Sequence, residues 1–162
     1  MSGLVAFSFA LGKNEPNPCN VRLADEVERI VLYSSEPLII VAQWEIAKAL
    51  TQRDFQHQLP LVHQFHSVER HRQGAYLDSE EVMAQAAILF RNHGVRQVTP
   101  VANPFLHLWK CRQLVRKAGF TVRNRKIGNI GFYPESDQWW TRGPVQLLAY
   151  TALQVATGRR GR

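Results

Sequence analysis

Residues 4–10 have the sequence LVAFSFA and residues 38–42 have the sequence LIIVA, and these two apolar runs decide the fold. Both runs are continuous rather than alternating, which is typical of strands buried on both faces of a sheet. Between them, Val21 to Ser34 carries apolar residues at helical spacing, and Asn20 is the expected N-cap. A buried strand, a helix and a second buried strand predict a right-handed βαβ unit with parallel strands.

The rest of the chain continues this alternation. Further helices are predicted over residues 44–52, 80–93, 105–118 and 145–156. Further strands are predicted at residues 59–62, 95–102 and 120–122, whereas residues 63–77 are polar and irregular. Asp78 or Ser79 caps the helix that follows, and Gly94 and Gly119 end two of the helices. The pattern predicts an α/β fold, a Rossmann-like three-layer sandwich whose mostly parallel sheet has about five strands with helices on both faces.

Length and charge limit the function classes. The 162 residues, 45% of them hydrophobic, favour one domain over residues 1–158, followed by a basic tail at 159–162. The formal net charge is +7, and three of the positive charges belong to the tail. The other residues, 17 basic and 13 acidic, carry only +4, so nucleic-acid binding is not favoured by charge.

Cysteine content and hydropathy exclude other classes. Cys19 and Cys111 are the only cysteines and form no CxxC motif, so neither a disulfide framework nor a cysteine-rich zinc site is expected. No apolar run reaches the ~18 residues that a membrane span requires. Met1 to Leu11 has no preceding positive charge and no cleavage-like site, which favours a strand over a signal peptide and a cytoplasmic location.

Three stretches carry a family resemblance through their order. The first strand ends in Leu11-Gly12 and leads to a helix start that contains Arg22, and Pro37 to Val41 forms the next strand. Val98 to Gly119 then contains a strand, a short turn with His107, and a basic helix that ends in glycine. In this order the stretches resemble the YdcF-like family, the SanA/ElyC group. The resemblance covers most of the chain and implies a Rossmann-like α/β protein, thought to be enzymatic and linked to envelope processes.

The chain also departs from the family pattern. After the second strand the family has a Ser-Gly-Gly turn, which Val41-Ala42-Gln43 replaces here. Glu45 then matches a glutamate of the family's next helix. Without those glycines, backbone amides approach a phosphate less closely. Asp78 to Glu81 keeps a capping oxygen and a carboxylate but lacks the family's asparagine. These losses leave open a degenerate, non-catalytic member.

Ligands of open parallel sheets bind beyond the carboxyl ends of the strands, and His107 is the candidate catalytic residue there. Its imidazole titrates near neutral pH, and it lies in the first turn of a helix, where backbone N–H groups favour an anion. A capping or surface histidine is the structural alternative. Asn103 precedes a proline and is expected to cap the same helix and to border a bound anion.

The other ligand-binding candidates lie on the neighbouring loops and helix starts. Gly12 permits close approach of a ligand, and Lys13 and Asn14 can meet a phosphate or a sugar. Arg22 stands at a helix start, where the dipole disfavours a cation, so a negative group is expected near it. The predicted ligand-binding residues are Gly12, Lys13, Asn14, Arg22, Gln43, Glu45, Glu80 and Asn103. Simple turns, caps and solvated side chains remain the alternative for each.

The histidine-rich segment does not predict a metal site. His57, His63, His66 and His71 lack HExxH or another strong ligand spacing, and charged neighbours favour a solvated loop. The absence of GxGxxG disfavours a dinucleotide oxidoreductase, and the absence of GxSxG disfavours an α/β-hydrolase. The sequence indicates no particular cofactor.

The expected function is therefore that of a YdcF-like protein that binds a small nucleotide-like or phosphorylated ligand at the carboxyl edge of the sheet. If it catalyses a reaction, His107 is the acid or base. The alternative is a non-catalytic binding or scaffold protein, for which a homodimer is left open. A third, less favoured hypothesis is weak nucleic-acid binding through the tail and one basic helix, which carries Lys110, Arg112, Arg116 and Lys117.

Overall fold

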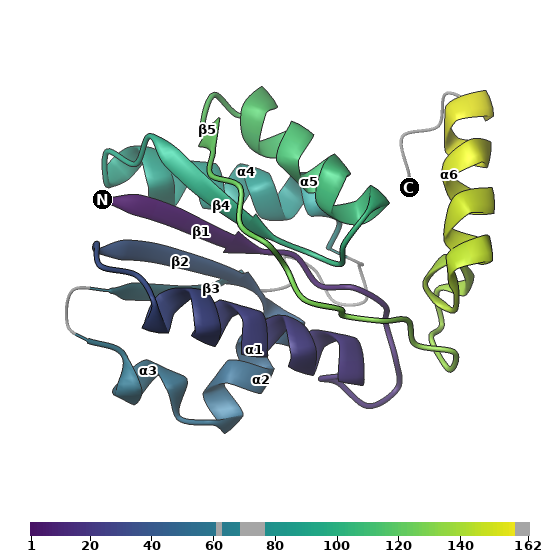
Figure 1. Cartoon of the computed structure of the whole chain (residues 1–162), viewed down its shortest axis with the longest axis horizontal. Helices are drawn as coiled ribbons and strands as arrows, with labels where there is room; N and C mark the ends of the chain where they lie inside the picture. The colour runs from purple at the N-terminus through teal and green to yellow at the C-terminus, as the bar shows by residue number, and fades with distance from the viewer. Residues whose placement is uncertain (61–62, 69–76, 158–162) are drawn as a thin grey trace.

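The computed structural model describes residues 1–60, 63–68 and 77–157, and its centre is a five-stranded sheet (Figure 1). The strands are β1 (Ser2–Ala6), β2 (Leu38–Gln43), β3 (Gln64–Val68), β4 (Gln97–Val101) and β5 (Thr121–Val122). Their order is β3-β2-β1-β4-β5, and every neighbouring pair is parallel. The predicted α/β class and parallel sheet are confirmed.

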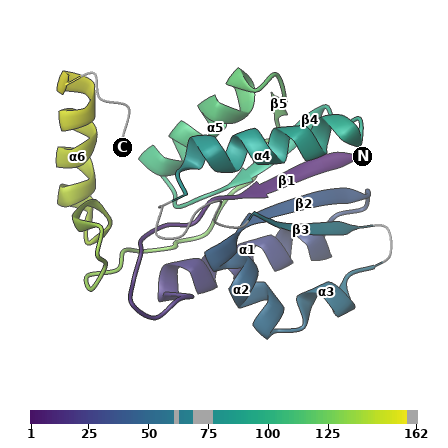
Figure 2. The same cartoon turned by 180° about the vertical axis from the view of Figure 1, so that it is seen from behind.

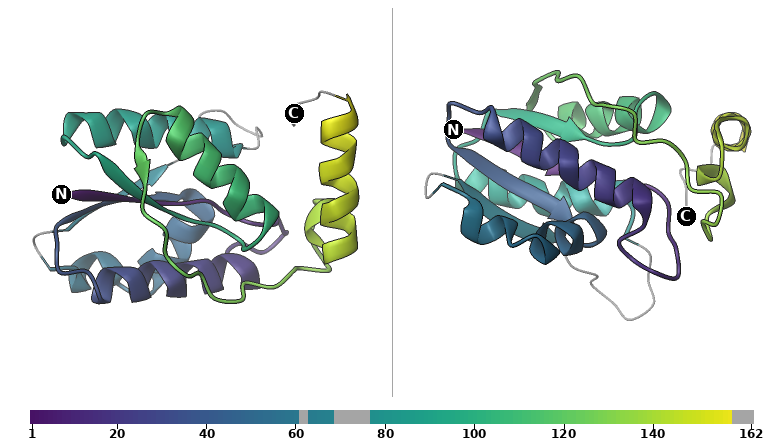
Figure 3. Two further views of the ribbon diagram at one scale, coloured as in Figure 1. Left: turned by 45° about the horizontal axis from the view of Figure 1, so that its top comes forward. Right: turned by 60° about the horizontal axis from the view of Figure 1, so that its bottom comes forward.

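Helices cover both faces of the sheet. One face carries α1 (Pro18–Leu32), α2 (Trp44–Gln52) and the short α3 (Phe55–Gln58), and the other carries α4 (Ser79–Asn92) and α5 (Leu106–Lys117) (Figures 1 and 2). The same three layers are visible when the molecule is tilted (Figure 3). Because both faces are covered, every residue of β1 and β2 is buried, which explains their continuous apolar sequences.

The start of α1 corrects one predicted cap. The N-cap is Asn17 rather than Asn20, and its side chain accepts hydrogen bonds from the N–H groups of Cys19 and Asn20. Pro18 occupies the first helical position, where a missing N–H costs nothing. Asn20 is buried within the helix, and its Oδ1 accepts a hydrogen bond from the N–H of Phe9. The loop after β1 is therefore held to the first turn of α1.

The ends of α4 and α5 follow the sequence prediction more closely. Asp78 caps α4 through a complete capping box with Glu81. Gly94 and Gly119 follow the two helices at φ of +65° and +92°, where a side chain would be strained.

The edge strand β3 was not predicted. Residues 55–58 form α3, and the strand lies at Gln64–Val68 instead of the predicted 59–62. Pro60 lacks the N–H that a strand donates to its neighbour, which disfavours a strand at residues 59–62. The observed strand β3 lies at the edge of the sheet and pairs only with β2. Most side chains of β3 are not buried, and its sequence is polar. His71 lies outside the described residues.

The C-terminal part stands beside the sandwich. The 3-10 helix η1 (Trp139–Thr141) leads into α6 (Pro144–Thr157), and both lie at the carboxyl end of the strands (Figures 1 and 3). The ring of Trp140 stacks on that of Tyr150 with centroids 4.5 Å apart, and Trp139 meets the same tyrosine edge-on at 5.8 Å. In the described part of the chain, no helix has the length and apolar character needed to cross a bilayer. The basic tail lies outside the described residues.

Candidate functional site

The strand order places a topological switch point between β1 and β4. The chain leaves β1 through α1 toward β2, and later crosses to β4 on the other side of β1. Loops that diverge at such a point leave room for a ligand at the carboxyl ends of the strands. The loop after β1 contains Phe9, and the loop after β4 contains Asn103 and leads to His107.

His107 lies at this point, in the first turn of α5. Its ring centroid is 5.6 Å from that of Phe9, and its Nε2 is 3.4 Å from the hydroxyl oxygen of Ser79 at the start of α4. Burial, with a smaller contribution from the charge of Lys110, lowers the pKa of His107 to about 4. The imidazole is therefore neutral at pH 7. Its Nδ1 atom is covered and has no hydrogen-bond partner among the described residues.

Cys111 is the third polar side chain of this cluster. It lies one turn after His107 on α5, and its thiol interacts with the hydroxyl of Ser79. Burial raises the pKa of the Cys111 thiol well above its usual range, so the sulfur keeps its proton. The neutral imidazole of His107 carries one proton, on Nδ1 or on Nε2, and the Ser79 hydroxyl donates to Nε2 in the first tautomer and accepts from it in the second. In the tautomer protonated at Nδ1, the group without a partner is an N–H donor.

The turn before α5 is strained. Phe105 is the N-cap, with φ of +71° and ψ of −123°, a conformation that non-glycine residues rarely adopt. The predicted cap, Asn103, is not the N-cap. Asn103 is buried, its amide donates to the carbonyl oxygen of Gly131 at 2.7 Å, and its own carbonyl accepts from the N–H of Leu108. No side chain caps α5, because the N-cap residue Phe105 has no polar group in its side chain.

The loop after β1 contains an internal anion. The Glu15 carboxylate accepts hydrogen bonds from the N–H of Gly12 at 2.8 Å and from the N–H of Asn17 at 2.9 Å. It also accepts from the side-chain amides of Asn17 and Asn20, at 3.0 and 3.2 Å. The backbone of Gly12, a predicted ligand residue, is therefore bound to a carboxylate of the chain itself. Lys13 and Asn14 are exposed on the same loop.

The segment that follows β5 returns across the carboxyl edge and holds two of the predicted residues. Arg22 is exposed, and its Nη1 donates to the carbonyl oxygen of Ile130 at 2.8 Å. Gly131, the next residue, accepts the amide of Asn103. This hydrogen bond means that Arg22 meets a backbone carbonyl rather than the acidic group expected from the sequence.

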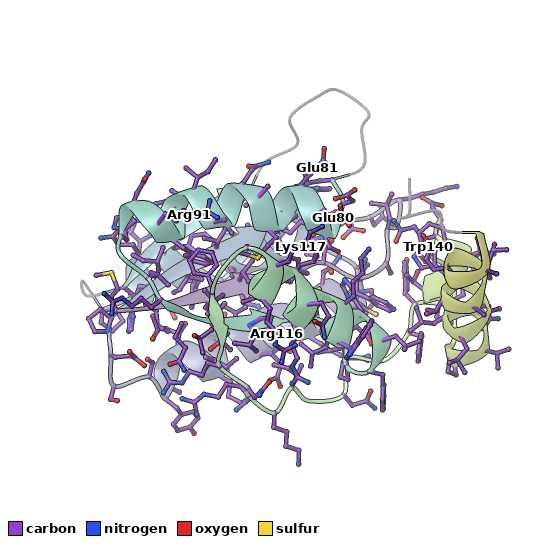
Figure 4. The ribbon with its side chains drawn as sticks, turned by 90° about the horizontal axis from the view of Figure 1, so that it is seen from above. Glu80, Glu81, Arg91, Arg116, Lys117 and Trp140 are labelled. Atoms are coloured by element: carbon purple, nitrogen blue, oxygen red, sulfur yellow. The ribbon has the colours of Figure 1, made fainter. Side chains whose placement is uncertain are left out.

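The remaining predicted ligand residues are divided between core and surface. Gln43 is buried, where its Oε1 accepts from the N–H of Ser8 and its Nε2 donates to the carbonyl oxygen of Leu77. Glu45 is also buried, at the start of α2. Glu80 is exposed at the start of α4 beside Glu81 (Figure 4). Through these two hydrogen bonds, Gln43 connects the end of β2 to the residue after β1 and to the segment before α4. The role of its side chain in this structure is therefore structural.

The structure thus brings His107 and Asn103 to the switch point and adds residues that the sequence analysis did not single out for the site. These are Phe9, Ser79 and Cys111. Ser79 is expected only as a cap from the sequence, because 28 residues separate it from His107 and no local spacing links the two. Among the described residues, no cluster of three or more His, Cys, Asp or Glu side chains is arranged to hold a metal ion.

The basic residues of α5 do not form one stripe. Lys110 and Lys117 are seven positions apart and share one side of the helix, whereas Arg112 and Arg116 are four apart on another side. Arg116 and Lys117 are exposed at the last turn of α5, away from His107 (Figure 4). This spacing gives a nucleic-acid backbone no continuous basic face on α5.

Comparisons with known proteins assign no family. No protein-family model and no curated protein matches the chain. A structure of Rhizobium etli pyruvate carboxylase with acetyl coenzyme A is similar over 75% of this chain and 11% of that one, at 12% identity and a TM-score of 0.38. The chain therefore spans a small part of that enzyme's length, and a likeness of this size carries no functional argument.

Proposed function

We propose that this protein binds a small phosphorylated or nucleotide-like ligand at the carboxyl edge of the sheet, with an anionic oxygen of the ligand accepting a hydrogen bond from Nδ1 of His107. The observation that carries the proposal is the covered Nδ1 of His107, which lacks a partner among the described residues. A buried polar atom without a hydrogen-bond partner is destabilising by about 1–3 kcal/mol, so a site that retains one invites a functional explanation.

Three features of the surroundings favour an anionic group. The first turn of α5 holds no acidic residue and no side-chain cap, so the helix dipole there is uncompensated. Lys110 adds positive charge close to the imidazole. The N–H of His107 itself has no acceptor among the described residues and belongs to the same turn.

Contact with Nδ1 requires a local rearrangement, because the atom is covered in this structure. The strained turn at Phe105 is the natural place for it. A residue held at φ of +71° releases strain when it moves to an ordinary conformation. Ligand binding that shifts this turn would therefore gain free energy from the relaxation as well as from the new hydrogen bond.

If the ligand reacts, Ser79 and His107 form the reacting pair, with the neutral imidazole as the base toward the hydroxyl at 3.4 Å. The YdcF-like assignment belongs to the same proposal. It is supported by the five-stranded parallel sheet and by a histidine in the helix that follows β4.

The second candidate function is a non-catalytic binding or scaffold protein. Two observations favour it. The Glu15 carboxylate already occupies the donors of the loop after β1, where a Rossmann-like fold would receive a phosphate. No third side chain among the described residues orients the imidazole through Nδ1, as a full catalytic triad requires.

The test is thermal unfolding with inorganic pyrophosphate and with AMP as probes. A probe at a hundredfold excess over its Kd stabilises the native state by about 2.7 kcal/mol, which raises Tm by roughly 5–10 °C in a domain of this size. We expect this shift in the wild type and in His93→Ala, which changes an exposed histidine at the far end of α4. We expect no shift in His107→Ala or His107→Gln.

An equal shift in the wild type and in both His107 variants would place the anion elsewhere and contradict the proposal. No shift for either probe in any variant would favour the scaffold function. Circular dichroism of the His107 variants at 20 °C would confirm that they are folded before their Tm values are compared.

A further inference from the structure

We propose that the outer side of α5 binds single-stranded nucleic acid, with a base stacked on Trp109 and phosphates paired with Arg112 and Arg116. These three residues are called the α5 stripe below. Trp109 follows His107 by two residues, so the two side chains lie on different sides of the helix. The stripe therefore lies outside the small-ligand site, although Phe105, one turn before Trp109, belongs to the strained turn of that site.

The positive charge of the chain is concentrated in one continuous segment. None of the 13 acidic residues lies within residues 82–134, which run from the first turns of α4 through β4, α5 and β5. A segment with cations and no anions produces a positive potential that attracts a polyanion. Its basic residues are Arg91, Arg96, Lys110, Arg112, Arg116, Lys117, Arg123, Arg125 and Lys126.

Most of these cations have no carboxylate beside them. Among the described residues, Arg123 is the only one of them that forms an ion pair, with Glu36. The side chains of Arg112 and Arg116 make no hydrogen bond to a described residue, and Nε of Arg112 is covered without a partner. Both guanidinium groups of the α5 stripe are therefore available to an external anion.

The α5 stripe is one face of the helix. Trp109, Arg112 and Arg116 have the spacing i, i+3 and i+7. The indole of Trp109 is 61% exposed, and Phe105, whose carbonyl oxygen accepts the N–H of Trp109, is 82% exposed. Arg116 is exposed on the side of α5 that faces away from α4 (Figure 4). Exposed rings thus precede two arginines along the same helix.

The chain after β5 extends the basic surface. In Figure 4 this segment runs on the side of α5 where Arg116 is labelled. The N–H of Arg123 donates to the carbonyl oxygen of Val98 at 2.9 Å, which holds the start of the segment beside β4. Arg125 and Lys126 follow and are exposed. A phosphate chain that leaves Arg116 on this side would meet these two charges.

A single strand fits this surface better than a duplex does. Bases of a single strand are free to stack on aromatic side chains, whereas a duplex hides the faces of its bases. The planar guanidinium of arginine binds a phosphate through two parallel hydrogen bonds. Residues 105–116 span about 16 Å at 1.5 Å per residue, which accommodates the shortest single-strand sites, about four nucleotides. With only two arginines over this length, α5 offers no continuous track for a duplex backbone.

Lipid and acidic proteins are poorer occupants. A helix that lies in a lipid interface buries an apolar face opposite its basic face. On α5 the exposed ring and the arginines share one side, while the apolar side is packed in the core. An acidic peptide could pair with the arginines but offers no flat ring to Trp109. The buried apolar residues of α5 are Leu108, Cys111 and Val115.

The experiment is fluorescence anisotropy with a dye-labelled 12-nucleotide oligothymidine that has no terminal phosphate. The wild type should bind it with a Kd of about 1–100 µM at 150 mM KCl. Trp109→Ala and Trp109→Leu should weaken binding at least about fivefold, whereas Trp109→Phe retains a ring and should keep most of the affinity. Tyr33→Ala removes a ring that is 77% exposed at the end of α1, and it should bind like the wild type.

The salt dependence tests the arginines separately from the ring. One phosphate contact on a single strand contributes about 0.7 to the slope of log Kd against log salt concentration. Arg112→Gln and Arg116→Gln should each lower the slope by about this amount, measured at 50, 100 and 150 mM KCl. Lys117→Gln removes the same charge from the same turn as Arg116 but on another side of α5, and it should leave the slope unchanged.

Several results would overturn the assignment: no binding at 200 µM protein, equal affinity of the wild type and Trp109→Ala, or a 12-base-pair duplex that binds as tightly as the single strand. An oligoglutamate, or vesicles with 30% phosphatidylserine, bound more tightly than the oligothymidine would assign the surface to another partner. His107→Gln should bind the strand like the wild type, and Trp109→Ala should keep the thermal shift with pyrophosphate. The two proposals therefore fail separately.

Discussion

Acidification should destabilise this protein through His107. The folded chain holds the imidazole with a pKa of about 4, against 6.5 in the unfolded chain. Between these values the unfolded state binds more protons, so acid favours unfolding. The contribution of His107 to stability is complete above pH 6.5 and falls as the pH drops toward 4.

The size of the effect follows from the two pKa values. A full shift of this size corresponds to about 3 kcal/mol, at 1.36 kcal/mol for each pKa unit. At pH 5 about 2 kcal/mol of it should already be lost relative to pH 7.5. His63 and His66 also have lowered pKa values because of burial, and Glu36 has one because of its hydrogen bonds to Ser2 and Arg123, so the wild-type profile alone does not isolate His107.

The measurement is therefore a difference between two proteins. Urea unfolding of the wild type and His107→Gln, followed by tryptophan fluorescence at pH 5.0, 6.0 and 7.5, gives two pH profiles. The other titrating groups contribute to both and cancel, so the variant should lose about 2 kcal/mol less than the wild type on going to pH 5. Parallel profiles would show that the imidazole is not held neutral and would refute the burial argument. His93→Gln serves as the exposed control.

Three further outcomes are expected. Asp78→Ala removes the capping box of α4 and should lower the free energy of unfolding by about 1 kcal/mol in urea, whereas Ser67→Ala, an exposed change in β3, should have little effect. Gln43→Leu leaves the N–H of Ser8 and a buried carbonyl without their partner and should cost about 1–3 kcal/mol in the same assay. Gly119→Ala places a side chain at φ of +92° and should lower Tm, even though no atom crowds the new methyl group; a Tm equal to the wild type would contradict the strain argument.

The central strands could be predicted from sequence because their environment determines their composition. Burial on both faces requires apolar residues throughout, as in Leu38 to Ala42, and few other structures give that pattern. The edge strand β3 meets one neighbour only, so polar residues such as Gln64 and Ser67 are tolerated and the signal is lost. The cap of α1 was wrong by three residues, although Pro18 at the first helical position was the available clue.

The site was harder to predict than the fold. His107 could be selected because it follows a strand and begins a helix, which are local properties. Its contact with Ser79 depends on how α4 packs beside α5, and the sequence contains no spacing that expresses this. Glu15 was a charged loop residue of the kind usually taken as solvated, yet four donors of its own loop and helix surround its carboxylate.

Glu15 also bears on where an anion can bind at the switch point. Two helices begin there, α1 after β1 and α5 after β4. At α1 the donors are already used by a carboxylate, so a phosphate would have to displace it or approach a like charge, which is unfavourable in a partly buried loop. At α5 the first turn has no acidic residue, the cap is strained, and the covered Nδ1 of His107 has no partner among the described residues. The negative charge of the proposed ligand is therefore expected at α5, where the loop after β1 would contribute the ring of Phe9 rather than hydrogen-bond donors.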